Sequence, residues 1–122
     1  IKDLENSLNH LTENGTIVMH DCSPPTEWHQ RPEHEYDGSG EWNGTTWKAY
    51  VEFKCKRNDL KMCVVDTDYG VGVIQRGKQK IWDKHPFEKC IQYDYLEKNR
   101  TKLLNLISYL DFEKKLIKGR LT

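Results

Sequence analysis

Hydrophobic residues fall into short stretches of two different periodicities along the chain. The first stretch places apolar residues at helical spacing, at Ile1, Leu4, Leu8 and Leu11. This spacing predicts an amphipathic helix. Residues 13–15 (Glu-Asn-Gly) are predicted to end it, with the asparagine or the glycine in the left-handed conformation. Residues 16–19 are β-branched and apolar, which predicts a buried strand.

Residues 22–44 show neither periodicity and are rich in proline, glycine and aromatic residues. A connection of this length inside a compact domain is usually either functional or disordered. Large aromatic residues, here Trp28, Tyr36 and Trp42, are scarce in disordered chains. We therefore expect a functional loop.

The second half of the chain returns to regular patterns. Thr45 or Thr46 can cap a helix with one side formed by Trp47, Tyr50, Val51, Lys54 and Cys55. Residues 62–67 (MCVVDT) and 68–77 (DYGVGVIQRG) predict two further strands. The turn between them is too short for a parallel crossover, so their pairing is predicted to be antiparallel. A last helix is predicted over residues 94–110 from Leu96, Leu103, Leu104, Ile107 and Leu110.

Composition and charge narrow the classes of function. The chain has 122 residues, with 19 basic and 19 acidic side chains, which predicts one domain without a general attraction for nucleic acid. No apolar run approaches the roughly 18 residues of a membrane span, and the amphipathic start differs from a signal peptide. The cysteines lie far apart without a CxxC pair, at Cys22, Cys55, Cys63 and Cys90. This spacing favours reduced thiols in a cytoplasmic protein. From the charge balance and the absence of a long apolar run, neither nucleic acid nor membrane is expected as a partner.

His20 and Asp21 directly follow the first predicted strand. In open α/β sheets, ligands bind in the crevice beyond the carboxyl ends of the strands, so both residues are candidates for a site. Two structural alternatives stay open. Asp21 can cap the turn at residues 23–25 by accepting backbone N–H bonds, and His20 can be a hydrogen-bonded histidine of the core.

The long loop contains four candidate substrate-binding residues: Trp28, His29, Arg31 and Trp42. Loops carry binding groups more often than buried strands do. The aromatic rings can stack on a sugar ring or another flat acceptor, or they can plug the loop onto its own domain. Both interpretations stay open at this point.

Gly70 and Gly72 lie in the sequence YGVGVIQRG. A nucleotide-binding glycine loop needs a third glycine at a set spacing and a helix that starts there, and both are missing here. We predict instead that these glycines allow close backbone packing or a bulge at the sheet edge.

Residues 1–77 resemble the second half of a class I S-adenosylmethionine-dependent methyltransferase. LTENGTIVMHD is similar to the helix and fifth strand of that family, and MCVVDTDYGVGVIQRG to its sixth and antiparallel seventh strands. WNGTTWKAYVEFK resembles the start of a helix in a bacterial branch of these proteins. The resemblance implies an α/β, three-layer Rossmann-like methyltransferase fold. This chain would be the C-terminal part, with strands 5, 6 and antiparallel 7 flanked by helices. We expect one domain over residues 1–122, with the resemblance over 1–77 and a helical extension over 78–122.

The resemblance also implies a function, in which S-adenosylmethionine is the cofactor and an oxygen of a small polar acceptor, such as a sugar, is methylated. Asp21 falls beside the acceptor pocket, where members of the family place a divalent metal or the acceptor hydroxyl. Asp21 and His20 are therefore the implied catalytic residues, and Asp21 is the implied ligand of Mg²⁺. The cofactor-binding glycine loop has no counterpart in this sequence, so its residues are unknown and the chain alone is expected to be inactive.

An alternative is a non-catalytic Rossmann-like module for binding or assembly. The predicted strand at residues 16–19 would expose one edge, because the strand that pairs with it in the whole fold is missing. Exposed edges invite pairing with another chain, so self-association into a homodimer through this edge is expected.

Overall fold

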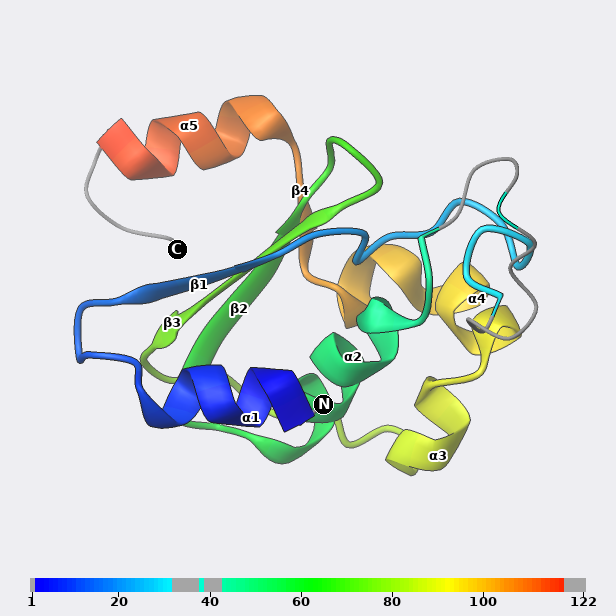
Figure 1. Ribbon diagram of the computed structural model, residues 1–122, viewed down its shortest axis with the longest axis horizontal. Coiled ribbons are helices and arrows are strands. Elements are labelled where there is room, and N and C mark those ends of the chain that lie inside the picture. The colour runs from blue at the N-terminus through cyan, green and yellow to red at the C-terminus, as the bar shows by residue number, and fades with distance from the viewer. Residues whose placement is uncertain (1, 32–37, 39–42, 118–122) are drawn as a thin grey trace.

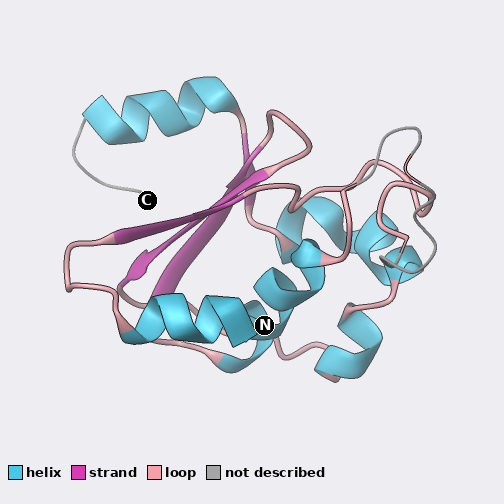
Figure 2. Ribbon diagram, viewed as in Figure 1, coloured by secondary structure: helices cyan, strands magenta, loops and turns pink. Residues whose placement is uncertain are grey.

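The computed structural model describes residues 2–31, 38 and 43–117 of the chain. These residues form an α/β structure in which helices flank an open, mixed sheet (Figure 1, Figure 2). In chain order the elements are α1 (Lys2–Asn9), β1 (Thr16–Met19), α2 (Thr46–Lys56), β2 (Leu60–Val65), β3 (Val71–Arg76), α3 (Phe87–Cys90), α4 (Tyr93–Leu103), β4 (Leu106–Ile107) and α5 (Tyr109–Ile117).

The sheet has four strands in the order β1-β3-β2-β4. The strand β3 runs antiparallel to both of its neighbours, and β4 runs parallel to β2. The predicted antiparallel pairing of the second and third strands is therefore confirmed. The strand β1 is far from β3 in the sequence but lies beside it in the sheet, with Met19 opposite Gly72.

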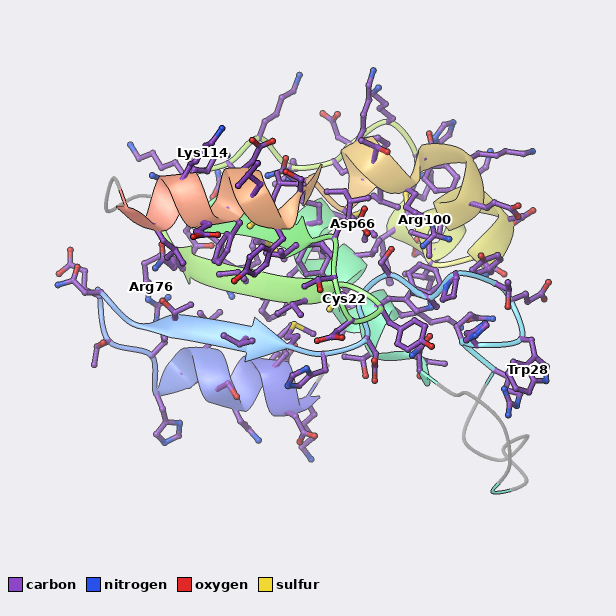
Figure 3. The ribbon with its side chains drawn as sticks, turned by 90° about the horizontal axis from the view of Figure 1, so that it is seen from above. Cys22, Trp28, Asp66, Arg76, Arg100 and Lys114 are labelled. Atoms are coloured by element: carbon purple, nitrogen blue, oxygen red, sulfur yellow. The ribbon has the colours of Figure 1, made fainter. Side chains whose placement is uncertain are left out.

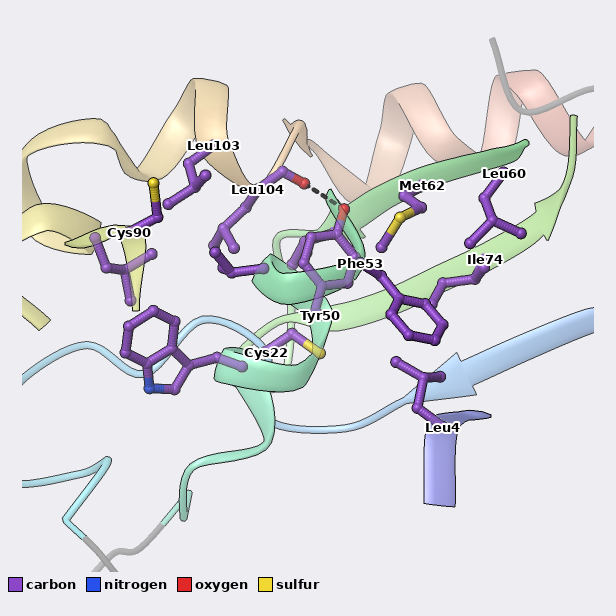
Figure 4. Close-up of a cluster of buried hydrophobic side chains, with 14 of the residues drawn as sticks. Leu4, Cys22, Tyr50, Phe53, Leu60, Met62, Ile74, Cys90, Leu103 and Leu104 are labelled. Carbon is purple, nitrogen blue, oxygen red and sulfur yellow. Dashed lines mark hydrogen bonds between the residues drawn. The ribbon is translucent and has the colours of Figure 1, made fainter. Parts of the chain in front are cut away.

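One face of the sheet holds the main core, under α1 and α2 (Figure 1). Alternate residues of β2 point into it, because side chains alternate between the two faces of a strand. The Tyr50 hydroxyl of α2 donates a hydrogen bond of 2.7 Å to the carbonyl of Leu104, so its polar end is satisfied in the interior (Figure 4). The side chains that are completely buried in this core include Trp47, Tyr50, Val51, Leu60, Val64, Ile74, Leu96, Leu103 and Leu104.

The opposite face is smaller and is covered by α5. Phe112 of that helix packs, together with Ile107, against Cys63, Val65 and Val73 of the sheet. The cover stops short of the β1 edge, where the side chain of Val18 is 57 % exposed. The prediction of a buried strand at residues 16–19 is therefore wrong: β1 is an edge strand whose side chains alternate between exposed and half-buried, because one of its faces is left uncovered. No strand of the described residues pairs with the outer edge of β1.

The predicted helix at residues 94–110 is wrong beyond Leu103. The chain leaves the helix at Leu104, and Asn105 adopts the left-handed conformation with φ 51°. Asparagine tolerates this conformation better than most residues. Its side chain donates to the Met62 carbonyl at 2.9 Å, and its own carbonyl accepts from Val64. The chain then pairs with β2 as β4, so the segment after Gly77 contributes a strand as well as helices.

The first turn also differs from its prediction. The helix α1 ends at Asn9, several residues before the predicted stop. Neither Asn14 nor Gly15 is left-handed. The turn at residues 10–15 is instead closed by backbone hydrogen bonds, such as the 3.1 Å bond from Gly15 to Thr12.

Two glycines allow the chain after β1 to approach β3 closely. A Cβ on Gly70 would lie 2.5 Å from the Cβ and 2.6 Å from the backbone nitrogen of Ser23. A Cβ on Gly72 would lie 2.9 Å from the Sγ of Cys22. The prediction that these glycines serve close packing is confirmed. Gly70 is also left-handed, with φ 87°.

We predict that Gly70→Ala destabilises the protein by about 3 kcal/mol or more, because left-handed strain of about 1–3 kcal/mol is added to a backbone clash. Gly38→Ala is the matched control, since Gly38 has φ 85° and open space around its Cβ position. It should cost only the strain, about 1 kcal/mol. Urea unfolding measures both values, and equal losses in the two variants would contradict the close approach.

Candidate functional site

Asp21 lies just beyond the carboxyl end of β1 in a strained backbone conformation. Its φ is 60°, in the left-handed region that few residues other than glycine adopt. Asp68 and Tyr69, in the turn between β2 and β3, share this conformation with φ values of 46° and 60°. Strained residues of this kind cluster at ligand sites, where the surrounding structure holds them in place. The end of β1 is therefore the first place to look for a site.

Asn43 holds the Asp21 carboxylate in place. Its Nδ2 donates to Asp21 Oδ1 at 3.2 Å, and its backbone N–H donates to the His29 carbonyl at 2.6 Å. The Asn43 side chain is buried, and its Oδ1 has no hydrogen-bond partner among the described residues. A buried acceptor without a partner costs about 1–3 kcal/mol. Asn43, the residue that joins the long loop to the end of β1, thus carries an energetic cost that other interactions of the fold must offset.

The structure decides between the alternatives for His20 and Asp21. His20 is exposed, so its interpretation as a core histidine is wrong. The capping interpretation of Asp21 is also wrong, because the Ser23 N–H donates to the Tyr69 carbonyl at 2.7 Å and the two prolines that follow have no N–H. The Asp21 carboxylate instead accepts a side-chain bond from a residue far along the chain.

The segment after Asp21 is docked on the turn between β2 and β3. The Cys22 N–H donates to the Gly70 carbonyl at 2.8 Å, beside the bond from Ser23 to Tyr69. These bonds continue the pairing of β1 with β3 past the end of the strand. Figure 3 shows Cys22 at this junction, between the strand β1 and the helix α4 that carries Arg100. The site therefore rests on the sheet rather than on a free loop.

Trp28, His29 and Arg31 form a compact group within the loop. The guanidinium of Arg31 lies 3.8 Å from the centre of the Trp28 ring, and the Trp28 and His29 rings meet edge-on at 5.3 Å. The Thr26 hydroxyl is 2.7 Å from His29 Nδ1. Trp28 is 50 % exposed, so this ring does not plug the loop onto the domain. An exposed, cation-backed indole ring offers a flat apolar face for stacking.

Asn43 connects the predicted residue Asp21 at the end of β1 with the predicted residue His29 in the long loop. The Asp21 carboxylate accepts a hydrogen bond from the Asn43 side chain, and the His29 carbonyl accepts one from the Asn43 backbone N–H. His29 also lies against Tyr69, with ring centres 5.8 Å apart. Trp42 lies outside the described residues. Sequence reasoning missed Asn43, although its position before Gly44, which has φ 67°, is a turn signal that could have marked it.

Cys22 lies beside Asp21 but is unsuited to nucleophilic chemistry. Its side chain is completely buried, and this burial raises the pKa of its thiol to about 12. The nearby Asp21 carboxylate raises this pKa further, while a backbone hydrogen bond from Gly72 lowers it. Thiolates, not thiols, are the reactive form of cysteine. The contacts of Cys22 are those of a packing residue, buried against Gly72.

A pocket of about 390 Å³ lies below the end of β1, between the first turns of α1 and α2. Met19 forms one wall, and the polar side chains around it come from Asp3, Thr45, Thr46, Lys48 and Glu52. Neither His20 nor Asp21 lines this pocket. No three His, Cys, Asp or Glu side chains of the described residues are arranged to hold a metal ion.

Comparisons of the chain with family models, with curated proteins and with solved structures give no match. Across the described ranges, every helix is too short or too polar to cross a membrane.

We predict that Asn43→Ala lowers the free energy of unfolding by about 1–2 kcal/mol, because it removes a hydrogen bond to a carboxylate while also removing the unpartnered Oδ1. The control is Asn58→Ala, whose side chain is exposed and which should change stability by less than about 0.5 kcal/mol. Urea unfolding measures both variants. Equal stability of wild type and Asn43→Ala would contradict the role of Asn43 as the link between loop and strand.

Proposed function

We propose that this chain is the acceptor-side part of an S-adenosylmethionine-dependent methyltransferase that methylates a hydroxyl of a small polar molecule, such as a sugar. Asp21 is the residue that meets the hydroxyl. The observation that carries the proposal is the placement of its carboxylate, half-buried beyond the end of β1 and held by Asn43. This is where ligands bind in open α/β sheets.

The order of the elements supports the proposal. A helix leads into β1, a long loop and a second helix follow, and the antiparallel β2–β3 hairpin ends the region that resembles the family. The helices α1 and α2 cover the same face of the sheet (Figure 1). This open mixed sheet is compatible with a Rossmann-like fold. The support for a function comes from the candidate site at the edge of the sheet.

The described residues do not fit the cofactor itself. The spaces beside Gly70 and Gly72, where a nucleotide would need to approach, are filled by Ser23 and Cys22. Mg²⁺ fits no better, since it needs about six oxygens and Asp21 supplies one or two. The neighbour of Asp21 is the Nδ2 of Asn43, a donor that cannot bind a cation. We therefore propose for this chain only the binding of the molecule that is methylated.

Methyl transfer to a hydroxyl would form an O–CH₃ bond as the S–CH₃ bond of the sulfonium donor breaks and S-adenosylhomocysteine leaves, and a base would have to take the hydroxyl proton. The Asp21 carboxylate accepts one bond from Asn43, and its remaining lone pairs can accept the bond from the acceptor hydroxyl. His20, exposed at the neighbouring position, is the second candidate base. Positioning by Asn43 keeps the carboxylate in one orientation, which favours reaction from a fixed geometry.

The exposed rings of the loop support a sugar-like acceptor. Trp28 presents half of its surface to solvent next to Arg31, and His29 joins this group to Asp21 through Asn43. A flat aromatic face with polar groups at its side suits the apolar face and hydroxyls of a sugar.

A non-catalytic assembly module is the second candidate function. The outer edge of β1 is unpaired within the described part of the chain, and Val18 beside it is 57 % exposed. A flat apolar edge is a site for strand pairing with a second copy. Such a module has no use for the Asp21 carboxylate, so substitution of Asp21 separates the two functions.

We predict that a neutral polyol probe, methyl β-glucoside, shifts the backbone NMR signals of residues 20–23 and 43. Asp21→Asn should weaken this binding at least about fivefold, because a neutral amide replaces the carboxylate that accepts the hydrogen bond from the probe hydroxyl. Asp83→Asn is the control, since Asp83 is an exposed carboxylate outside the candidate site. In an assay in which the cofactor-binding part of the proposed methyltransferase is supplied, Asp21→Asn should also lower kcat for methyl transfer about 100-fold or more, with unchanged thermal stability. Asp21→Asn with wild-type binding and turnover would remove Asp21 from the function.

A further inference from the structure

We propose that Arg100 binds an oxyanion, the carboxylate or phosphate group of the acceptor. Arg100 would be a second binding position in the same site, and its link to an acceptor rests on the proposed function. The anion site itself follows from the contacts and charges around Arg100.

Arg100 extends from α4 to the segment that follows β1 (Figure 3). Its Nη1 donates to Ser23 Oγ at 2.9 Å, and its Nη2 donates to the Tyr93 hydroxyl oxygen at 3.0 Å. The Tyr93 O–H donates in turn to the Pro25 carbonyl at 2.8 Å. The guanidinium is thus held in one orientation by hydroxyl groups, so it needs little ordering before it binds a ligand.

The charge of Arg100 is not neutralised within the described residues. Both of its hydrogen-bond partners are neutral, and no carboxylate there forms an ion pair with it. Arg57 shows the opposite case, because two of its N–H groups bind the Asp59 carboxylate at 2.8 and 2.6 Å. A guanidinium has five N–H donors, and Arg100 uses one at each of two partners, which leaves three. A half-buried cation with unused donors is well suited to an oxyanion.

Arg100 binds the chain segment that directly follows Asp21. Its partner Ser23 follows Asp21 by two residues, so the Cα atoms of Ser23 and Asp21 are at most about 7 Å apart. A small molecule can therefore reach both groups. The negative charge of Asp21 disfavours an oxyanion at its own position, which orients the ligand with a hydroxyl toward Asp21 and the oxyanion toward Arg100. Hydroxy acids and sugar phosphates have this combination of groups.

A purely structural role is the competing explanation. Arg100 joins α4 to the loop after β1 through Ser23 and Tyr93, and this contact alone would stabilise the fold. A structural clamp predicts no response to added anions, whereas a binding residue predicts a saturable one.

The test titrates the chain with inorganic phosphate in one arm and acetate in the other, against sodium chloride at equal ionic strength. NMR signals of the Arg100 side chain and of the Ser23 and Tyr93 amides report binding. We expect saturation at millimolar concentration in at least one arm, and that arm identifies the oxyanion. Arg100→Gln should weaken binding at least about tenfold. Arg100→Lys should weaken it severalfold, because an ammonium group lacks the planar fork of donors.

Arg57→Gln is the matched control, since it removes the same charge from an arginine that already has a carboxylate partner. It should change the affinity less than about twofold. Absence of saturation in both arms, or equal weakening in Arg57→Gln and Arg100→Gln, would overturn the proposal. Phosphate binding at Arg100 without polyol binding at Asp21 would overturn the acceptor role and leave the anion site. Polyol binding without anion binding would overturn the anion site alone.

Discussion

The close approach of Ser23 to Gly70 is the constraint on which the site depends. The chain leaves β1 at Met19 but remains attached to β3, because Cys22 and Ser23 donate to the carbonyls of Gly70 and Tyr69. This pairing leaves no room for a side chain at Gly70. The chain is thus fixed on both sides of Asp21, at Met19 by pairing with β3 and at Cys22 by its bond to the turn between β2 and β3. A left-handed Asp21 is the conformation that joins these two fixed points.

The same constraint brings together groups from distant parts of the chain. Asn43 reaches Asp21 from the end of the long loop, and Arg100 reaches Ser23 from α4. Arg100 thus binds inside the docked segment, whereas Asn43 binds the residue directly before it. The Asp21 carboxylate and the Arg100 guanidinium form no ion pair with each other, although Asp21 and Ser23, the partner of Arg100, both lie just beyond β1. Two opposite charges kept apart by a fixed segment are suited to a ligand that carries both a hydroxyl and an anionic group.

The local parts of the structure could be predicted from the sequence. The apolar strand at β1, the helix after Thr45 and the antiparallel hairpin all follow from periodicity and connection length. The last helix could not be predicted correctly, because Leu103, Leu104 and Ile107 fit helical spacing although Asn105 breaks it and Ile107 belongs to a strand. That break depends on the pairing of β4 with β2, which is a long-range contact.

The site was predicted only in part for the same reason. Asp21, His20 and the loop residues follow strands or share a loop, and such positions can be recognised in a sequence. Asn43 and Arg100 are separated from Asp21 by long stretches of chain and become visible only when the fold places them. For Asp21, a bond to the local backbone was one of two open alternatives, and the structure shows a bond from a distant side chain instead.

Native-state hydrogen exchange of the Cys22 and Ser23 amides tests most directly whether the site rests on the sheet. Both amides form short hydrogen bonds to the β2–β3 turn, at 2.8 and 2.7 Å. If the segment remains docked, their protection factors should lie within about tenfold of those in the β2–β3 pairing, because the two regions open together. Exchange at the rate of an unprotected peptide would show that the segment leaves the sheet freely and would contradict this account.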